Sequence, residues 1–367
     1  MNQSTRWIVG VIMVVTLITI GYFLLKGSSD FSVEPIKIGV IAPMTGNTAF
    51  LGEGIRDAIL LAKENLNGTK YKYEVIFEDD QLDSKLTASA VNKLISVDKV
   101  DVIITFGSGP GNVVAPIAEQ RGVVHFGIAS DPNVAKGNYN FIHWTPPSEE
   151  NKVFVAELQR RGINKLGVFE SNQQGAAAVI ADLRERLKGT DIEIVTDQLF
   201  NVGEKDFRSI ITKAKNSGAE IYLLMAFSPE LEVLAKQIKE AGVDTPLTSI
   251  EGFELTEQVD LFEGEWYVNA ADATGDFISK FSAKTGKSPT LGVANSYDIF
   301  NLVVATIEKI KGSVKPLSEE IAQEITRVKN FDGALGNLSV NEDGLVISKA
   351  AVRMIKDGEP ATISSAE

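Results

Sequence analysis

The chain has 367 residues, of which 44% are hydrophobic and 23% are charged, so it is long and apolar enough for two globular domains. Its formal net charge of −13 repels nucleic acid and anionic lipid surfaces, and we expect no nucleic-acid partner. The absence of cysteine excludes disulfides, thiolate nucleophiles and a lipid-modified N-terminal cysteine, and only His125 and His143 remain for a zinc site or a Ser/His/Asp triad.

The N-terminus carries an apolar run over residues 7–25, with Arg6 before it and Lys26 after it. At about 1.5 Å per residue, a helix of this run approaches the thickness of the hydrocarbon core of a membrane. Residues 1–26 fit a cleaved signal peptide or an uncleaved signal anchor, and we favour the anchor because the run is long and no small-residue cleavage site follows it. The positive flank then places the body of the chain outside the cytoplasm, after a linker at 27–35.

Short apolar runs alternate with amphipathic ones from Ile36 onward, which predicts parallel sheets covered by helices. The pattern restarts after Pro146-Pro147, which predicts two lobes. The first series predicts strands at 36–42, 73–77, 100–106 and 123–128 and helices at 54–66, 87–97 and 112–120. The second predicts helices at 152–161, 176–187, 207–215 and 231–241 and strands at 165–169, 192–196 and 221–227.

The last third is less regular. It predicts a strand at 266–271, helices at 276–283, 293–310 and 318–328, and two paired strands at 333–340 and 345–352. We expect hinge crossings near Pro146, Ala271 and Asn330. The predicted domains are a first lobe of residues 36–146 plus 271–330, a second lobe of 147–270 plus 331–360, and a tail at 361–367.

Open parallel sheets bind ligands outside the carboxyl ends of their strands, and small or polar residues follow several strands here. Residues 107–111 form a glycine-rich turn before a helix, without the spacing of a phosphate loop. This turn fits equally an anion site that includes the Ser108 hydroxyl and a tight turn in which Ser108 caps the helix. Glu251 follows a strand of the second lobe, where a carboxylate facing the cleft would pair with a ligand ammonium.

Several motifs in order resemble the leucine/isoleucine/valine-binding family, the type I periplasmic binding proteins of ABC importers. They are Ile38–Gly46, Gly52-Glu53, Glu78–Asp80, Ala90–Ile95, Ala129–Pro132, Phe227–Glu230, Glu251-Gly252 and Tyr297-Asp298. The resemblance covers nearly everything after the linker. It implies an α/β fold of two doubly wound parallel-sheet lobes joined by a three-crossing hinge, which the N-terminal membrane helix would precede.

The resemblance also implies site residues. Ser108, Ala129 and Ser130 would hold a ligand α-carboxylate, and Ser130 and Glu251 would hold its ammonium, so the ligand would be an amino acid or a close analogue. The sequence departs from the family at Leu51, where an aromatic residue is common, and at Gln174 and Phe227, where tyrosine is common. These three positions would help to set the specificity for the ligand side chain.

We therefore expect a monomeric, extracytoplasmic solute-binding protein, anchored to the cytoplasmic membrane, that closes on a small polar ligand and serves an ABC permease. No metal or other cofactor is expected. The alternatives are a ligand-sensing subunit of the same fold for a signalling partner and an enzyme on the same scaffold. Against an enzyme, the sequence has no nucleophile elbow, no kinase motif set and no paired-carboxylate motif.

Overall fold

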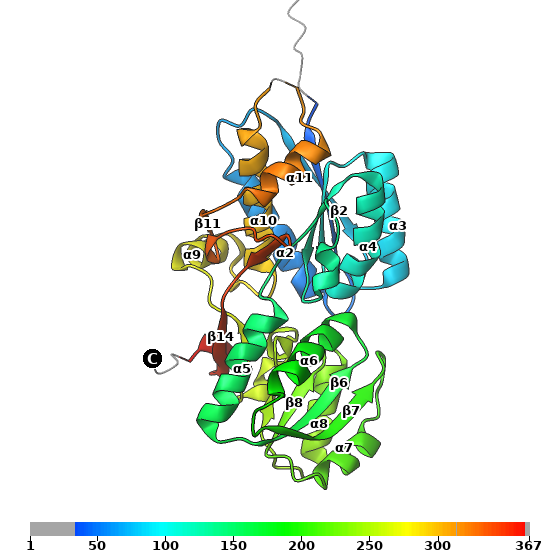
Figure 1. Cartoon of the computed structure of the whole chain (residues 1–367), viewed down its shortest axis with the longest axis vertical. Coiled ribbons are helices and arrows are strands. Elements are labelled where there is room, and N and C mark those ends of the chain that lie inside the picture. Colours follow the sequence, from blue (N-terminus) through cyan, green and yellow to red (C-terminus); the bar gives the residue numbers. More distant parts are fainter. Residues whose placement is uncertain (1–33, 313, 364–367) are drawn as a thin grey trace, which may run out of the picture. The chain divides into compact units, whose positions relative to one another are not determined.

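The computed structural model describes residues 34–312 and 314–363. The predicted membrane helix at residues 7–25 lies outside these ranges. Within them, no helix is long and apolar enough to cross a membrane. The described residues from Pro35 onward belong to one compact unit, which contains two parallel sheets and two smaller antiparallel ones (Figure 1).

The first sheet has six parallel strands in the order β13-β5-β4-β3-β1-β2. These are β1 (Ile36–Ala42), β2 (Tyr73–Asp79), β3 (Val102–Phe106), β4 (Val124–Ile128), β5 (Asn140–Trp144) and β13 (Leu345–Ile347). One face carries α3 (Ser84–Lys93) and α4 (Ser108–Arg121), and α2 (Ala49–Glu64) and α10 (Val293–Lys309) pack together on the other side (Figure 1). The central strands β3 and β4 are buried on both faces, as parallel strands between helices are.

The second sheet has the parallel order β7-β6-β8-β9. Its strands are β6 (Lys165–Ser171), β7 (Glu193–Phe200), β8 (Ile221–Met225) and β9 (Leu247–Thr248). A bridge between Ile250 and Val268 links it to an antiparallel group of β10 (Trp266–Ala270), β14 (Ala350–Lys356) and β15 (Glu359–Thr362). One core cluster lies under α5 (Pro147–Arg161) and α6 (Gln174–Leu187), and another under α7 (Arg208–Lys215) and α8 (Glu230–Glu240).

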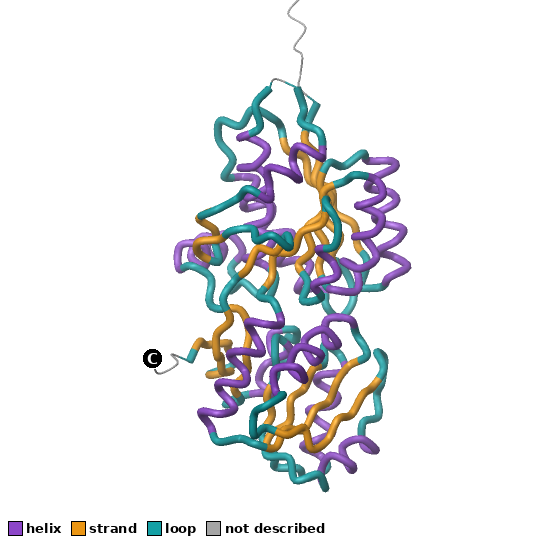
Figure 2. The backbone as a smooth tube through the Cα atoms, in the orientation of Figure 1, coloured by secondary structure: helices purple, strands orange, loops and turns teal. Residues whose placement is uncertain are grey.

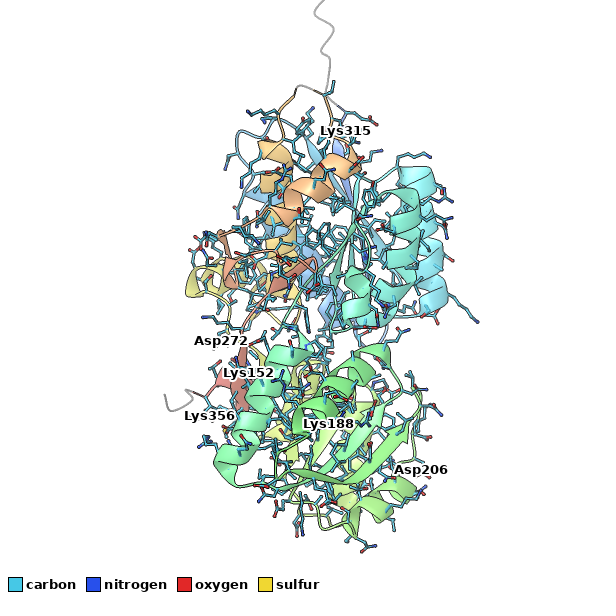
Figure 3. All side chains as sticks on the ribbon, viewed as in Figure 1. Lys152, Lys188, Asp206, Asp272, Lys315 and Lys356 are labelled. Carbon is cyan, nitrogen blue, oxygen red and sulfur yellow. The ribbon has the colours of Figure 1, made fainter. Side chains whose placement is uncertain are left out.

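The chain passes three times between the two sheets, whose strands form two separate groups in Figure 2. The first two crossings, at 145–146 and 271–274, lie near the predicted Pro146 and Ala271. Asp272, labelled in Figure 3, belongs to the second crossing. After it the chain forms α9 (Gly275–Thr285), α10 and α11 (Ser318–Thr326).

The third crossing is at 348–349, and its prediction near Asn330 was wrong. The predicted pairing of 333–340 with 345–352 was also wrong, apart from one bridge between Val340 and Val346. Instead, β11 (Phe331–Gly333) pairs with β12 (Gly336–Leu338), and β13 joins β5 in the first sheet. Residues 331–347 therefore accompany the first sheet, because the open edge of β5 offers β13 a full ladder of backbone hydrogen bonds.

Helix α5 begins five residues earlier than the predicted 152. Pro147 occupies its first turn, where the missing N–H of proline costs nothing and its fixed φ favours the helix. This early start places Glu149 and Glu150 in the first turn of α5, directly after the first crossing.

Candidate ligand-binding site

Three neighbouring strands of the first sheet end at one edge, and each is followed by a polar side chain. Ser108 begins α4 after β3, Ser130 follows β4, and Trp144 ends β5. Because the carboxyl ends of parallel strands meet at the same edge of a sheet, these side chains lie together. All three are buried.

The Ser108 hydroxyl shapes this edge. Its Oγ accepts the backbone N–H groups of Ser130 and Asp131, each at 3.1 Å. The cap of α4 is instead Gly107, with φ 94° and no capping side chain, so the alternative in which Ser108 caps its own helix does not hold. Ser108 thus fixes the segment around Ala129, which is 4% exposed.

In the second sheet, too, predicted site residues follow the carboxyl ends of neighbouring strands. Gln174 begins α6 after β6, Phe227 follows β8, and Glu251 follows β9, and these strands are neighbours in the sheet. Glu251 has φ 65° and ψ −41°, and the Gly252 N–H donates to the Ile250 carbonyl at 2.8 Å. This is a γ-turn of the strained kind, which non-glycine residues rarely adopt and which is found at functional sites.

Gly252 makes this turn possible. A Cβ at position 252 would lie 2.4 Å from Ser249 Oγ and 3.1 Å from the carbonyl oxygen of Ala226. A side chain at position 252 would therefore have to displace the Ser249 hydroxyl and press on the Ala226 carbonyl, so glycine suits this turn.

Hydrogen bonds join the two edges at Glu251. Its Oε1 accepts Ser130 Oγ–H at 2.7 Å and Trp144 Nε1–H at 2.6 Å. The side chain is 3% exposed. Burial raises the pKa of Glu251, and the hydrogen bonds from Trp144 and Ser130 act in the opposite direction.

The N-termini of α4 and α6 also meet. A Cβ on Gly175 would lie 3.1 Å from Ser108 Oγ, and a Cβ on Gly109 would lie 3.5 Å from Gln174 Oε1. The structure thus brings Ser108, Ser130, Gln174 and Glu251 together. The hydrogen-bonded group does not include Leu51, which is buried in α2, or Phe227, which packs against the core of the second sheet.

Sequence reasoning missed Trp144, Gly175 and Glu150. Glu150 is 0% exposed, and within the described residues neither of its carboxylate oxygens has a hydrogen-bond donor. Burial raises its pKa well above the ordinary value, and the nearby carboxyl of Glu251 raises it further. The feature of the sequence that could have indicated Glu150 is Pro147, because a proline can begin a helix as well as end one, and Glu150 lies in the first turn of that helix.

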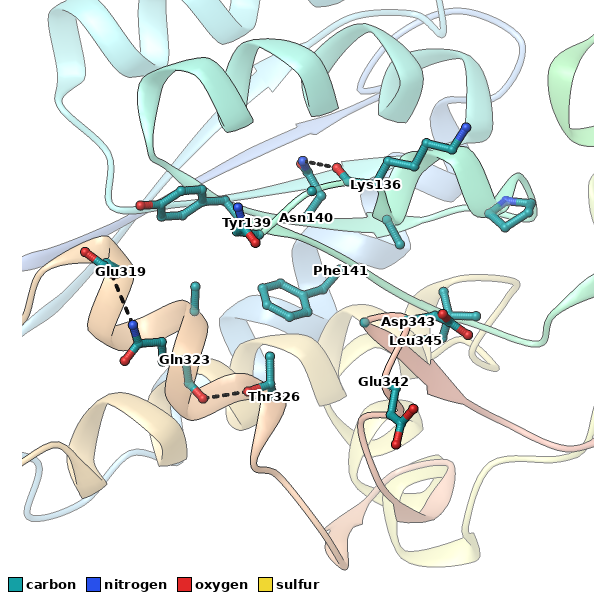
Figure 4. A pocket seen from close by; sticks show the side chains of 16 residues that line it. Lys136, Tyr139, Asn140, Phe141, Glu319, Gln323, Thr326, Glu342, Asp343 and Leu345 are labelled. Carbon is teal, nitrogen blue, oxygen red and sulfur yellow. Dashed lines mark hydrogen bonds between the residues drawn. The ribbon is translucent and has the colours of Figure 1, made fainter.

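A separate groove of about 860 Å³ lies beside β5, between the segment 132–141, α11 and the turn at 342–345 (Figure 4). Its charged lining side chains are Lys136, Glu319, Glu342 and Asp343. None of the predicted site residues lines it, so the groove and the candidate site are different places.

Both histidines have partners in the first sheet. His125 is buried between Thr105 Oγ1 at 2.8 Å and Asn140 Oδ1 at 3.0 Å, and burial lowers its pKa to about 4. His143 bonds the carbonyl oxygen of Val346 at 3.0 Å and so links β5 to β13. These contacts are those of structural side chains.

A family model described as periplasmic binding protein matches residues 35–360. The chain is 25% identical over 336 residues to a leucine-, isoleucine-, valine-, threonine- and alanine-binding protein of Pseudomonas aeruginosa, an alignment that covers 86% of this chain and 88% of the relative. Its fold matches that of a leucine-binding protein, LivK, of Thermotoga maritima, with a TM-score of 0.82 and 23% identity over 90% of this chain and 98% of the other.

A second similar structure is the solute-binding protein of an ABC transporter from R. palustris in complex with benzoate. Its TM-score is 0.81 at 17% identity, over 90% of this chain and 95% of the other. The chain belongs to the periplasmic binding protein family, as the sequence-based resemblance predicted, and it is similar to leucine/isoleucine/valine-binding proteins.

Proposed function

We propose that this chain is an extracytoplasmic solute-binding protein that captures an amino acid or a related ammonium-bearing solute by hinge closure and delivers it to an ABC permease. The observation that carries the proposal is Glu251, a buried carboxyl on a strained turn that bonds Ser130 and Trp144 of the other sheet. A buried carboxylate between two moving parts suits the recognition of an ammonium group.

Capture would proceed in two steps. The first sheet offers the Ser108 hydroxyl and the segment at Ala129 and Ser130, where the ligand carboxylate would bind first. Rotation at the three crossings would then bring Glu251 onto the ligand ammonium in place of the Ser130 and Trp144 donors. Closure removes water from the charged pair, and this strengthens the attraction.

Leu51, Phe227 and Gln174 would border the ligand side chain. Their mixed size and polarity do not reproduce an aromatic wall, so we do not carry the ligand of any relative over to this chain. The fold alone accommodates different chemistry, since the R. palustris structure holds benzoate.

The proposed location is outside the cytoplasmic membrane, with residues 7–25 as an anchor and the monomer as the working form. The relatives are solute-binding proteins, and this supports binding without catalysis. Turnover assays on any ligand that binds would detect an enzyme.

The test is isothermal calorimetry and thermal shift of the full chain in mild detergent. The panel contains neutral and basic amino acids, amino-acid amides, diamines and small carboxylates without an amine. A ligand of the folded state should raise the midpoint of unfolding by mass action.

Glu251→Gln should weaken binding of an ammonium-bearing ligand by about 30-fold or more, because it removes one partner of a buried charged pair. Glu185→Gln, at an exposed carboxyl of α6, is the matched control and should bind as the parent does. Unchanged affinity in Glu251→Gln would remove this residue from the site. Binding of amine-free carboxylates alone would overturn the ammonium proposal.

A further inference from the structure

Glu150 differs from the other buried carboxyls of the described residues in having no hydrogen-bond donor. Arginine, hydroxyl, amide or backbone N–H donors serve Asp80, Asp131, Glu157, Glu170, Glu230, Glu232, Glu251 and Asp298. The group that Glu150 faces is the carboxyl of Glu251, with which it can form a hydrogen bond only while one of the two holds a proton. A fully buried carboxyl of the first turn of α5 thus lies against the proposed ammonium site and receives no hydrogen bond from another donor of the described residues.

The charges of this pair are not balanced from within the described chain. The interactions that act on the two carboxyls are burial, each other, and the hydrogen bonds from Trp144 and Ser130. None of these partners is a lysine, arginine or histidine. Two adjacent buried carboxyls can hold one proton between them, but full ionisation requires a cation.

At the other end of the site, near Ser108, few hydrogen-bond donors are free to bind a carboxylate of the ligand. The backbone N–H groups of Ser130 and Asp131 already donate to Ser108 Oγ. A neutral zwitterion would bring one ammonium for two carboxyls and add a carboxylate of its own. A ligand with one further positive charge would bring one cationic group for each of the two carboxyls.

Resting on the proposed function, we propose that the site selects ligands of net positive charge, such as a basic amino acid, and that Glu150 is the specificity-determining residue that receives the additional cation. Glu251 would hold the first ammonium, and Glu150 would hold the second cationic group. The strained turn at Glu251 and the first turn of α5 keep the two carboxyls adjacent.

The experiment compares L-lysine with L-norleucine, two amino acids that differ in the terminal ammonium, on the full chain by calorimetry. The parent should bind lysine at least about tenfold more tightly, since norleucine leaves one buried carboxyl without a cation. Equal affinities, or tighter binding of norleucine, would overturn the inference. This comparison uses the parent chain and does not depend on any variant folding.

Glu150→Gln should reduce the affinity for lysine by about tenfold or more and leave that for norleucine unchanged or improved. Glu149→Gln is the matched control, because Glu149 is the preceding residue, partly exposed and near Lys152. An equal effect of Glu150→Gln on both probes would assign Glu150 a structural role and refute the inference.

The two proposals fail differently. If no member of the panel binds, the proposed function fails. If only net-neutral members bind, the proposed function stands and the preference for net positive charge is refuted.

Discussion

Two acidic clusters lie close to the crossings, and they differ in burial and in how their charges are matched. In the first cluster, Arg353 of β14 pairs with Glu254 at 2.9 Å and with Asp272 of the second crossing. Tyr267 completes it by donating to Glu254 at 2.8 Å. In the second cluster, Glu150 and Glu251 face each other without a cation.

The difference separates a cluster that holds the fold together from one that awaits a ligand. Arg353 ties three segments, β14, the second crossing and the short helix after Glu251, and its charge is satisfied within the chain. At neutral pH the Glu150–Glu251 pair costs folding free energy that a bound proton or an external cation recovers. Removing the arginine from the first cluster should therefore lower the free energy of unfolding. Removing one carboxyl from the second cluster should raise it.

Arg353→Met should have the largest effect, a loss of up to about 3 kcal/mol in the free energy of unfolding, because it leaves the mostly buried Glu254 carboxyl without its cation. Urea unfolding followed by circular dichroism measures it. Arg208→Met, in an exposed pair with Asp206, is the control and should leave the urea midpoint where it is. A similar midpoint in both variants would mean that the Arg353 cluster contributes no more than a surface pair.

Glu150→Gln should act in the other direction and stabilise the ligand-free chain at pH 7. The pKa of Glu150 is raised in the folded state. Below its ordinary pKa of about 4.5 the carboxyl is protonated in both the folded and the unfolded chain, so its ionisation costs the fold nothing there. The cost increases as the pH rises towards the folded-state pKa, by at most about 1.4 kcal/mol per pH unit for one proton.

The gain from Glu150→Gln should thus be near zero at pH 4.5 and increase towards pH 7. Urea midpoints at several pH values for parent and variant measure it. A gain that does not change with pH would show that Glu150 does not take up a proton on folding.

Asp272→Asn should have the smallest effect, a loss below about 1 kcal/mol, because the Asp272 side chain is 51% exposed and water already solvates it. The same urea assay measures it. A loss as large as that of Arg353→Met would show that the pair of Arg353 with Asp272, and not the pair with Glu254, supplies most of the stability of this cluster.

The alternation of strands and helices was predictable because the central parallel strands are buried on both faces and read as short apolar runs, whereas the helices between them are amphipathic. The positions of Ser108, Ser130, Gln174 and Glu251 after strands were predictable for a related reason. A parallel sheet turns every strand in the same direction, so the residues that follow its strands gather at one edge. The cap of α3 by Asp83, which accepts the N–H groups of Lys85 and Leu86, is likewise a contact between near neighbours in the chain.

The sequence by itself determined the alternating α/β architecture with parallel sheets, the family and the strand-end positions of most of the candidate site, because these depend on local periodicity and chain direction. Only the tertiary structure decided that β13 joins β5, that the Ser108 hydroxyl accepts the N–H groups of Ser130 and Asp131, and that Glu150 faces Glu251. Each of these joins segments that are distant in the chain or lie on different sheets. Such a contact forms between groups that come together only when the chain has folded. A local sequence pattern therefore does not predict it.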